Sequence, residues 1–174
     1  MRYRRILVPG GTYFFTLTLA RRRSDLLVRH ISALREAMRV VKERHPFSII
    51  AMVVMPDHLH AIWRLPQGDA DYPLRWSLIK SGFSRRISQR ELLTPSRLDK
   101  GERGIWQRRY WEHQIRDERD LQKHVDYIHF NPVKHGIVNH PAAWPHSTLL
   151  RYVANGLLPA DWGGVDEGME CGER

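Results

Sequence analysis

Two histidines stand one residue apart in the stretch VVMPDHLHAIW, residues 53–63, and they are the first candidates for chemistry in this chain. On a β-strand, residues i and i+2 leave the same face with Cα atoms about 6.5–7 Å apart. Two imidazoles held in this way can bind one cation, so the spacing of His58 and His60 is typical of a metal site. The alternative is a pair of solvated histidines on a half-exposed sheet, and the short motif alone leaves both interpretations open.

A second candidate group lies in HVDYIHFNPVKHG, residues 124–136, which has helical periodicity. Tyr127 and Asn131 are one helical turn apart. Both lie off the centre of an apolar stripe formed by Leu121, Val125 and Ile128. We therefore expect Tyr127 to point at the rim of the sheet, with Asn131 offering an amide oxygen as a third metal ligand. Two alternatives stay open: Tyr127 as an aromatic half-buried against the sheet, and Asn131 as the N-cap of a new short turn beginning at Pro132.

The charge of the chain indicates a polyanionic partner. Lys and Arg number 28 against 19 Asp and Glu, a net charge of +9. Residues 161–174 hold five acidic residues and one basic residue, so residues 1–160 carry 27 basic against 14 acidic residues, or +13. Arginines recur beside aromatic residues, as in WQRRYWEHQIR, and guanidinium groups bind phosphate oxygens and stack on bases. The alternative is a surface that is basic without a specific partner.

The elements that must position these residues follow from hydrophobic periodicity. We expect strands over residues 12–19, 47–55 and 58–65, with Pro56 and Asp57 as the turn between the last two. Helices are expected over 27–45, 73–92 and 120–130, the last capped by Asp117 or Asp120, and a further extended segment over 104–116. This order predicts an α+β fold, an antiparallel sheet with helices packed on one face. Leu59, Ala61, Trp63 and Leu65 would meet the helices, leaving the histidines on the opposite, open face.

The length and the cysteine count predict one domain in a reducing compartment. We expect a single domain over residues 1–155 and an acidic tail over 156–174. One cysteine, Cys171, allows no intramolecular disulfide and no cysteine-based zinc site. The first residues lack an apolar signal region, and FSIIAMVVM is about half of the ~20 residues that span a bilayer, so no membrane association is expected.

Together these motifs resemble a known family. MPDHLHAIW resembles the HUH motif of the single-tyrosine nucleases, and HVDYIHFNPVKHGIV resembles the tyrosine helix of the REP-associated tyrosine transposases, relatives of the IS200/IS605 transposases. The likeness extends to GGTYFFTLTL, IWQRRYWEHQIR and WPHST. It implies a ferredoxin-like (RRM-like) sheet of the HUH nuclease type, with His58, His60 and Asn131 as ligands of Mg²⁺ or Mn²⁺. It also implies Tyr127 as the nucleophile.

The resemblance further implies a metal-dependent single-stranded DNA endonuclease and strand transferase acting on REP-type hairpins through a 5′-phosphotyrosine intermediate. We expect a monomer located in the cytoplasm with the nucleoid. Candidates for phosphate contacts are Arg21, Arg22, Arg23, Arg85, Arg86, Arg108 and Arg109. Trp106 and Trp111 are candidates for base stacking, with core packing as their alternative. Asp57 is expected either to orient the imidazole of His58 or only to form the turn.

Two other functions remain open at this stage. A non-catalytic nucleic-acid-binding module of RRM-like shape would explain the charge and the fold without the histidines and the tyrosine. A metal-dependent hydrolase using activated water would leave Tyr127 a structural residue. A covalent protein–DNA adduct separates the binding module from the nuclease, and activity kept in Tyr127→Phe would indicate the hydrolase. The charge split further suggests that the acidic tail folds over the basic surface and competes with DNA.

Overall fold

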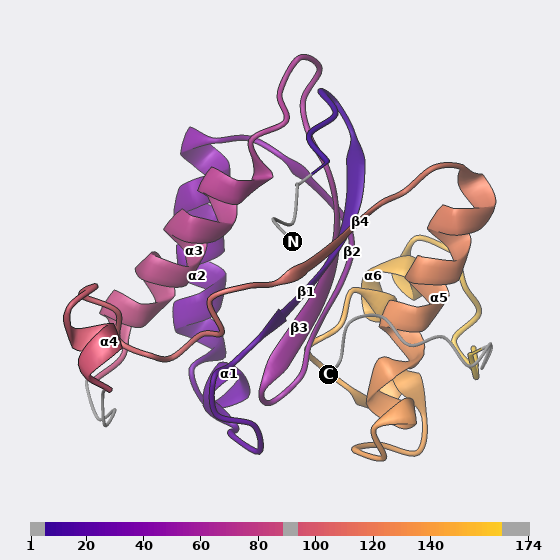
Figure 1. Ribbon diagram of the computed structural model, residues 1–174. Coiled ribbons are helices and arrows are strands. Elements are labelled where there is room, and N and C mark those ends of the chain that lie inside the picture. The colour runs from indigo at the N-terminus through magenta and orange to yellow at the C-terminus, as the bar shows by residue number, and fades with distance from the viewer. Residues whose placement is uncertain (1–5, 89–93, 165–174) are drawn as a thin grey trace.

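A four-stranded antiparallel sheet in the order β2-β3-β1-β4 forms the centre of the computed structural model, which describes residues 6–88 and 94–164 (Figure 1). The strands are β1 (Thr12–Thr18), β2 (Ser48–Val54), β3 (His58–Arg64) and β4 (Trp111–Gln114). Of the extended segment expected over 104–116, only β4 is a strand, and a single bridge joins Trp106 to Leu19. The histidine-bearing β3 is therefore internal, held by hydrogen bonds on both edges.

Helices α2 (Ile31–Arg44) and α3 (Tyr72–Arg86) pack together on one face of this sheet (Figure 1). The side chains of Leu59, Ala61, Trp63 and Leu65 all belong to the core beneath them, as their alternation predicted. Trp63 stacks on Trp76 of α3 with ring centroids 3.8 Å apart. Two short helices, α1 (Leu26–Arg29) and α4 (Pro95–Leu98), flank this layer. The predicted α+β class, with an antiparallel sheet and helices packed against it, is confirmed.

The opposite face of the sheet carries helix α5 (Glu118–Lys134), so the expectation that this face is open is wrong. The 3₁₀ turn η1 (Pro141–Ala143) and helix α6 (Leu149–Ala154) lie on the same side (Figure 1). Val125 and Ile128 of α5 form a second apolar core with Phe14, Val53 and Ile62 of the strands. These apolar strand residues lie on the same face as the histidines. Each Å² of apolar surface that they remove from water contributes about 25 cal/mol to stability. The face is too apolar to remain exposed.

The two ends of α5 are fixed by their local sequence. Asp117 is the N-cap, and its carboxylate accepts a hydrogen bond from the backbone N–H of Asp120 at 2.8 Å. The helix continues through Pro132 and ends before Gly136, whose φ of +64° is the left-handed conformation that glycine adopts at helix ends. Asn131 therefore lies inside α5, and its interpretation as the N-cap of a new turn is wrong.

Two expectations about the whole chain remain predictions. Residues 165–174, most of the expected acidic tail, lie outside the described residues. The boundary at residue 155 is likewise untested. Within the described ranges, no helix combines the length and the apolar character needed to cross a membrane.

Candidate active site

The β2–β3 hairpin delivers His58 and His60 to the sheet face that α5 covers. The backbone N–H of Met55 donates to the carbonyl of His58 at 2.9 Å, with Pro56 and Asp57 in the turn as predicted. The side chains of His58 and His60 are 3% and 0% exposed, and their ring centroids lie 5.1 Å apart. They are thus not solvated surface residues, and the period of two does put them on one face.

Each imidazole is held through its Nδ1 atom. The Nδ1 of His58 lies 2.7 Å from the Asp57 carboxylate, and that of His60 lies 2.9 Å from the Thr16 hydroxyl. The second oxygen of Asp57 lies 3.2 Å from the guanidinium Nε of Arg22. Metal-binding histidines characteristically use one nitrogen for such an outer hydrogen bond and the other for the cation. Asp57 therefore orients His58 in addition to forming the turn, and a cation would be bound through the two Nε2 atoms.

The protonation of these groups suits a cation. Burial lowers the pKa of His60 well below its ordinary value, and the neighbouring His58, His135 and Lys134 lower it further. His60 is therefore neutral at pH 7, the form that binds metals. The Nε2 of His58 is buried and has no hydrogen-bond partner among the described residues, a costly state that a ligand at this atom would relieve. The donor set fits a divalent cation.

Tyr127 of α5 lies over the same site. Its ring centroid is 5.2 Å from that of His60, and the ring planes are nearly perpendicular at 73°. The side chain is 6% exposed and belongs to the second core, so the expected position at the rim of the sheet is wrong, because α5 lies across this face. The ammonium Nζ of Lys134 is 4.7 Å from the centre of the Tyr127 ring. A positive charge thus lies beside the tyrosine.

Asn131, the third predicted ligand, lies one helical turn after Tyr127 and is fully buried. This spacing puts both side chains on one side of α5. A buried amide oxygen is a hard ligand of the kind that Mg²⁺ and Mn²⁺ prefer. The structure therefore supplies two imidazoles from β3, and a phenol and an amide from α5.

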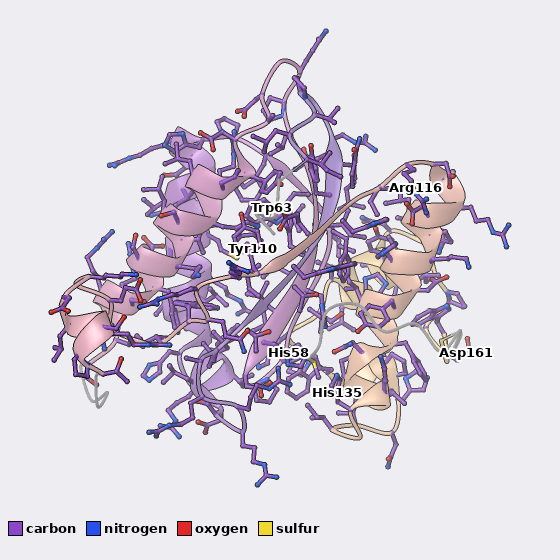
Figure 2. All side chains as sticks on the ribbon, viewed as in Figure 1. His58, Trp63, Tyr110, Arg116, His135 and Asp161 are labelled. Atoms are coloured by element: carbon purple, nitrogen blue, oxygen red, sulfur yellow. The ribbon has the colours of Figure 1, made fainter. Side chains whose placement is uncertain are left out.

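His135, which the sequence did not single out, lies at the end of α5 beside His58, with ring centroids 5.0 Å apart (Figure 2). Burial lowers the pKa of His135 to about 4, with further contributions from His58 and Lys134. A pocket of about 600 Å³ has His58 and His135 in its wall, together with Arg23 and Arg29. The available signal was the sequence KHG at the end of the tyrosine helix: the glycine ends the helix and so puts His135 at its C-terminus.

Several of the predicted phosphate contacts line neighbouring pockets. Arg21 and Arg23 line one of about 780 Å³, which shares Arg23 and Arg29 with the His58 pocket. Arg85 and Arg108 line a third, of about 670 Å³. The second and third pockets share Gly104 and Ile105, so three pockets with basic walls adjoin one another.

Of the remaining candidates for DNA contact, Trp106 lines the third pocket and the others are not in the walls of these three pockets. Arg22 pairs with Asp57, Arg86 donates to the Gly82 carbonyl, and Arg109 is exposed. Trp106 is 8% exposed and packs on Phe83, so little of its ring is accessible to a base. Trp111 is 36% exposed and lies on β4, against Phe14 and on the α5 side of the sheet. The two tryptophans therefore do not form a common stacking surface.

A second cluster of ionisable side chains was also missed from the sequence. This group consists of His113 of β4 with Asp120 and His124 of α5. Their possible metal-ligand atoms all lie within 4.8 Å of one another. The cluster lies toward the N-terminal end of α5, near Arg116, whereas His135 lies at the other end (Figure 2). It is therefore separate from the His58 pocket.

Comparison with known proteins adds independent information. The family model described as "Transposase IS200 like" matches residues 9–131. The REP-associated tyrosine transposase of Escherichia coli K12 is 46% identical over 172 residues, covering 99% of this chain and 96% of that protein. A protein of Haemophilus influenzae is 42% identical over 163 residues, with 93% of each chain covered. The solved structure of a REP-associated tyrosine transposase bound to a REP hairpin has a TM-score of 0.87 and 46% identity, covering 100% of this chain and 98% of that one.

Proposed function

This chain belongs to the IS200-like transposases and, among them, to the REP-associated tyrosine transposases, and from this premise we propose that it cuts and rejoins single-stranded DNA at REP-type hairpins through Tyr127. One observation carries the proposal. A tyrosine from α5 lies 5.2 Å, ring to ring, from His60, the second histidine of a buried pair on β3. A binding module has no need to bury two imidazoles beneath a phenol.

His58, His60 and Asn131 would hold Mg²⁺ or Mn²⁺, which when bound would offset the charge that develops on the scissile phosphate. The buried Nε2 of His58 and the neutral state of His60 support this assignment. Thr16 and Asp57 fix the orientation of the two rings, so that little rearrangement would be needed on binding. The second group of candidate ligands, formed by His113, Asp120 and His124, is not assigned to this ion.

In the proposed reaction the phenol of Tyr127 is the nucleophile. The Tyr127 oxygen attacks phosphorus, the bond from phosphorus to the 3′ oxygen breaks, and the phenol proton is lost while the departing 3′ oxygen gains one. A tyrosine has an ordinary pKa of about 10, so it needs help to lose its proton at pH 7. The ammonium of Lys134, 4.7 Å from the ring centroid, favours negative charge there. The 5′ phosphate stays esterified to Tyr127, and a 3′ hydroxyl can reverse the step and join strands without ATP.

The substrate assignment is supported by the arginine-lined pockets that adjoin the His58 pocket and by the relative bound to a REP hairpin. Guanidinium groups in such a series can follow a flexible phosphate backbone. An accessible backbone is also what an in-line attack requires. We further propose that the protein acts as a monomer on DNA in the cytoplasm, with Tyr127 serving the histidines of its own chain.

The test is adduct formation with a fluorescent single-stranded REP-type hairpin and Mn²⁺ or Mg²⁺, followed on a denaturing gel. The wild type should give a protein–DNA band that survives SDS, and Tyr127→Phe and His58→Ala should give none. Tyr152→Phe is the matched control, because it removes another hydroxyl from the same side of the sheet, one that donates to the Ile50 carbonyl. Tight binding without an adduct would indicate a binding module. Cleavage that persists in Tyr127→Phe would indicate a water-using hydrolase.

A further inference from the structure

The first turns of α5 are joined to β4 by a hydrogen-bonded group that we call the His113 cluster: His113, Arg116, Asp120 and His124. The Nε2 of His113 lies 2.9 Å from the Asp120 carboxylate, which also accepts from the backbone N–H and the Nε of Arg116 at 3.1 and 3.2 Å. The Nδ1–H of His124 donates to the Asp120 carbonyl at 2.8 Å. Asp120 and His124 are buried, so the bond between them is shielded from water, whereas the side chain of Arg116 is exposed.

The geometry of the His113 cluster favours hydrogen bonding over a second metal site. The rings of His113 and His124 are stacked, with centroids 4.8 Å apart and planes inclined by 16°. A nitrogen lone pair lies in the plane of its ring, so two nearly parallel stacked rings do not aim at a common ion. The guanidinium of Arg116 already compensates the carboxylate of Asp120. The carboxylate of Asp120 therefore has three hydrogen-bond donors without a cation.

His124 of the cluster contacts Phe14, and Phe14 in turn contacts the candidate active site. His124 lies one helical turn before Tyr127, and its ring centroid is 4.8 Å from that of Phe14. Phe14 is in turn 6.0 Å from the ring of Tyr127 and 5.5 Å from that of His60, on which it stacks at 22°. The same phenylalanine thus contacts His124 and both members of the His60–Tyr127 pair.

We infer that His124 is a positioning residue for Tyr127: its ring, stacked on His113 of β4, fixes the rotation of α5 about its axis and, through Phe14, the placement of Tyr127 over His60. An ionised carboxylate with several directed hydrogen bonds admits one arrangement, whereas apolar packing alone tolerates small rotations of a helix. The consequence for cleavage rests on the proposed function. The placement itself is a property of the fold and can be measured without DNA.

The test uses the full chain labelled with 3-fluorotyrosine, with the ¹⁹F resonance of Tyr127 assigned by its loss in Tyr127→Phe. His124→Leu removes the ring that stacks on His113 of β4 but keeps an apolar side chain beside Phe14. His124→Phe is the conservative variant, because its ring can stack on His113 and contact Phe14 as the imidazole does. His129→Leu is the matched control: this buried histidine of α5 bonds Thr148 at 3.0 Å and contacts Tyr152, away from the His113 cluster.

We expect His124→Leu to move the Tyr127 resonance and to slow single-turnover cleavage at least ~10-fold, with the hairpin Kd within about twofold of wild type, because small misplacements cost chemistry more than binding. His124→Phe should restore both, and His129→Leu should change neither. An unmoved Tyr127 resonance in His124→Leu would overturn the inference. If the purified wild type contained one equivalent of zinc and His113→Asn contained none, the His113 cluster would be a metal site and the inference would be overturned. A moved resonance in a protein that forms no adduct would support the inference while the proposed function fails.

Discussion

The ring of Tyr127 lies 5.2 Å from that of His60 and nearly perpendicular to it, although one belongs to α5 and the other to β3. Hydrogen bonding on both edges fixes β3 within the sheet, whereas α5 is held on the sheet by the core beneath it and by the His113 cluster. The pair is therefore made by two separately stabilised elements. Substitutions that disturb one element should be distinguishable from those that disturb the other.

Thr16→Val tests whether the hydroxyl on β1 orients His60 for a cation. Losing the 2.9 Å hydrogen bond to Nδ1 should raise the Mn²⁺ concentration for half-maximal adduct formation by about 10- to 100-fold. The free energy of unfolding should fall by only about 1 kcal/mol. Titration of Mn²⁺ in the gel assay measures the first, and urea unfolding the second. Thr12→Val on the same strand, whose hydroxyl accepts from Arg64, is the control; an identical Mn²⁺ requirement in both variants would contradict this role.

Asp57 separates orientation of His58 from turn formation. Asp57→Ala removes the 2.7 Å contact with Nδ1, and we expect the Mn²⁺ requirement to rise by about 10- to 100-fold. Asp57→Asn keeps an acceptor and a good turn residue but loses the charge, so its effect should be smaller. If Asp57 only formed the turn, Asp57→Ala would lower the melting temperature and leave the Mn²⁺ titration unchanged.

Local periodicity was sufficient to predict the strands of the sheet and the faces of their residues, but not to predict which helix covers each face. The alternation on β3 put His58 and His60 on one face because the period of a strand is fixed by its geometry. The position of α5 across that face is a long-range contact that no local pattern encodes. The missed signal was Phe14 and Ile62, apolar residues on the same face as the histidines, which predict that something must cover it.

The His113 cluster escaped sequence analysis for a related reason. His113, Asp120 and His124 are separated by seven and four residues across a strand, a turn and a helix, so no single periodicity links them. Asp120 was interpreted as a possible cap, and the structure gives that function to Asp117. Spacing predicts partners within one element, and partners between elements require the fold.

Arg75 holds together a region remote from the site. It is buried in α3 and donates to the carbonyls of His45 and Pro46 at 3.1 and 2.8 Å and to Asp69 at 2.6 Å. Arg75→Met should lower the free energy of unfolding by about 3 kcal/mol, since these acceptors lose a charged donor. Arg39→Met, at an exposed arginine paired with Glu36, should leave the free energy of unfolding nearly unchanged, because solvent screens the pair. Urea unfolding of both variants measures the difference, and equal losses would contradict the argument.

The stability of the His113 cluster should depend on pH through Asp120. Burial alone would raise the pKa of this carboxyl, but hydrogen bonds from His113 and Arg116 outweigh it and hold the pKa at about 2, below the ordinary 3.8. A lowered carboxyl pKa contributes stability that is complete above pH 3.8 and is lost as the pH falls to about 2. The contribution amounts to roughly 2 kcal/mol.

Comparison of the wild type with Asp120→Asn isolates this contribution. The difference in free energy of unfolding should be largest at about pH 5 and should shrink by roughly 2 kcal/mol as the pH approaches about 2, because the native carboxylate is then protonated as well. Asp99→Asn, at an exposed carboxyl after α4, corrects for the general effect of removing one negative charge. If the difference in free energy of unfolding between wild type and Asp120→Asn stayed constant over this range, Asp120 would not be the ionised acceptor that binds His113 and Arg116. The attachment of α5 to β4 would then have to come from apolar packing alone.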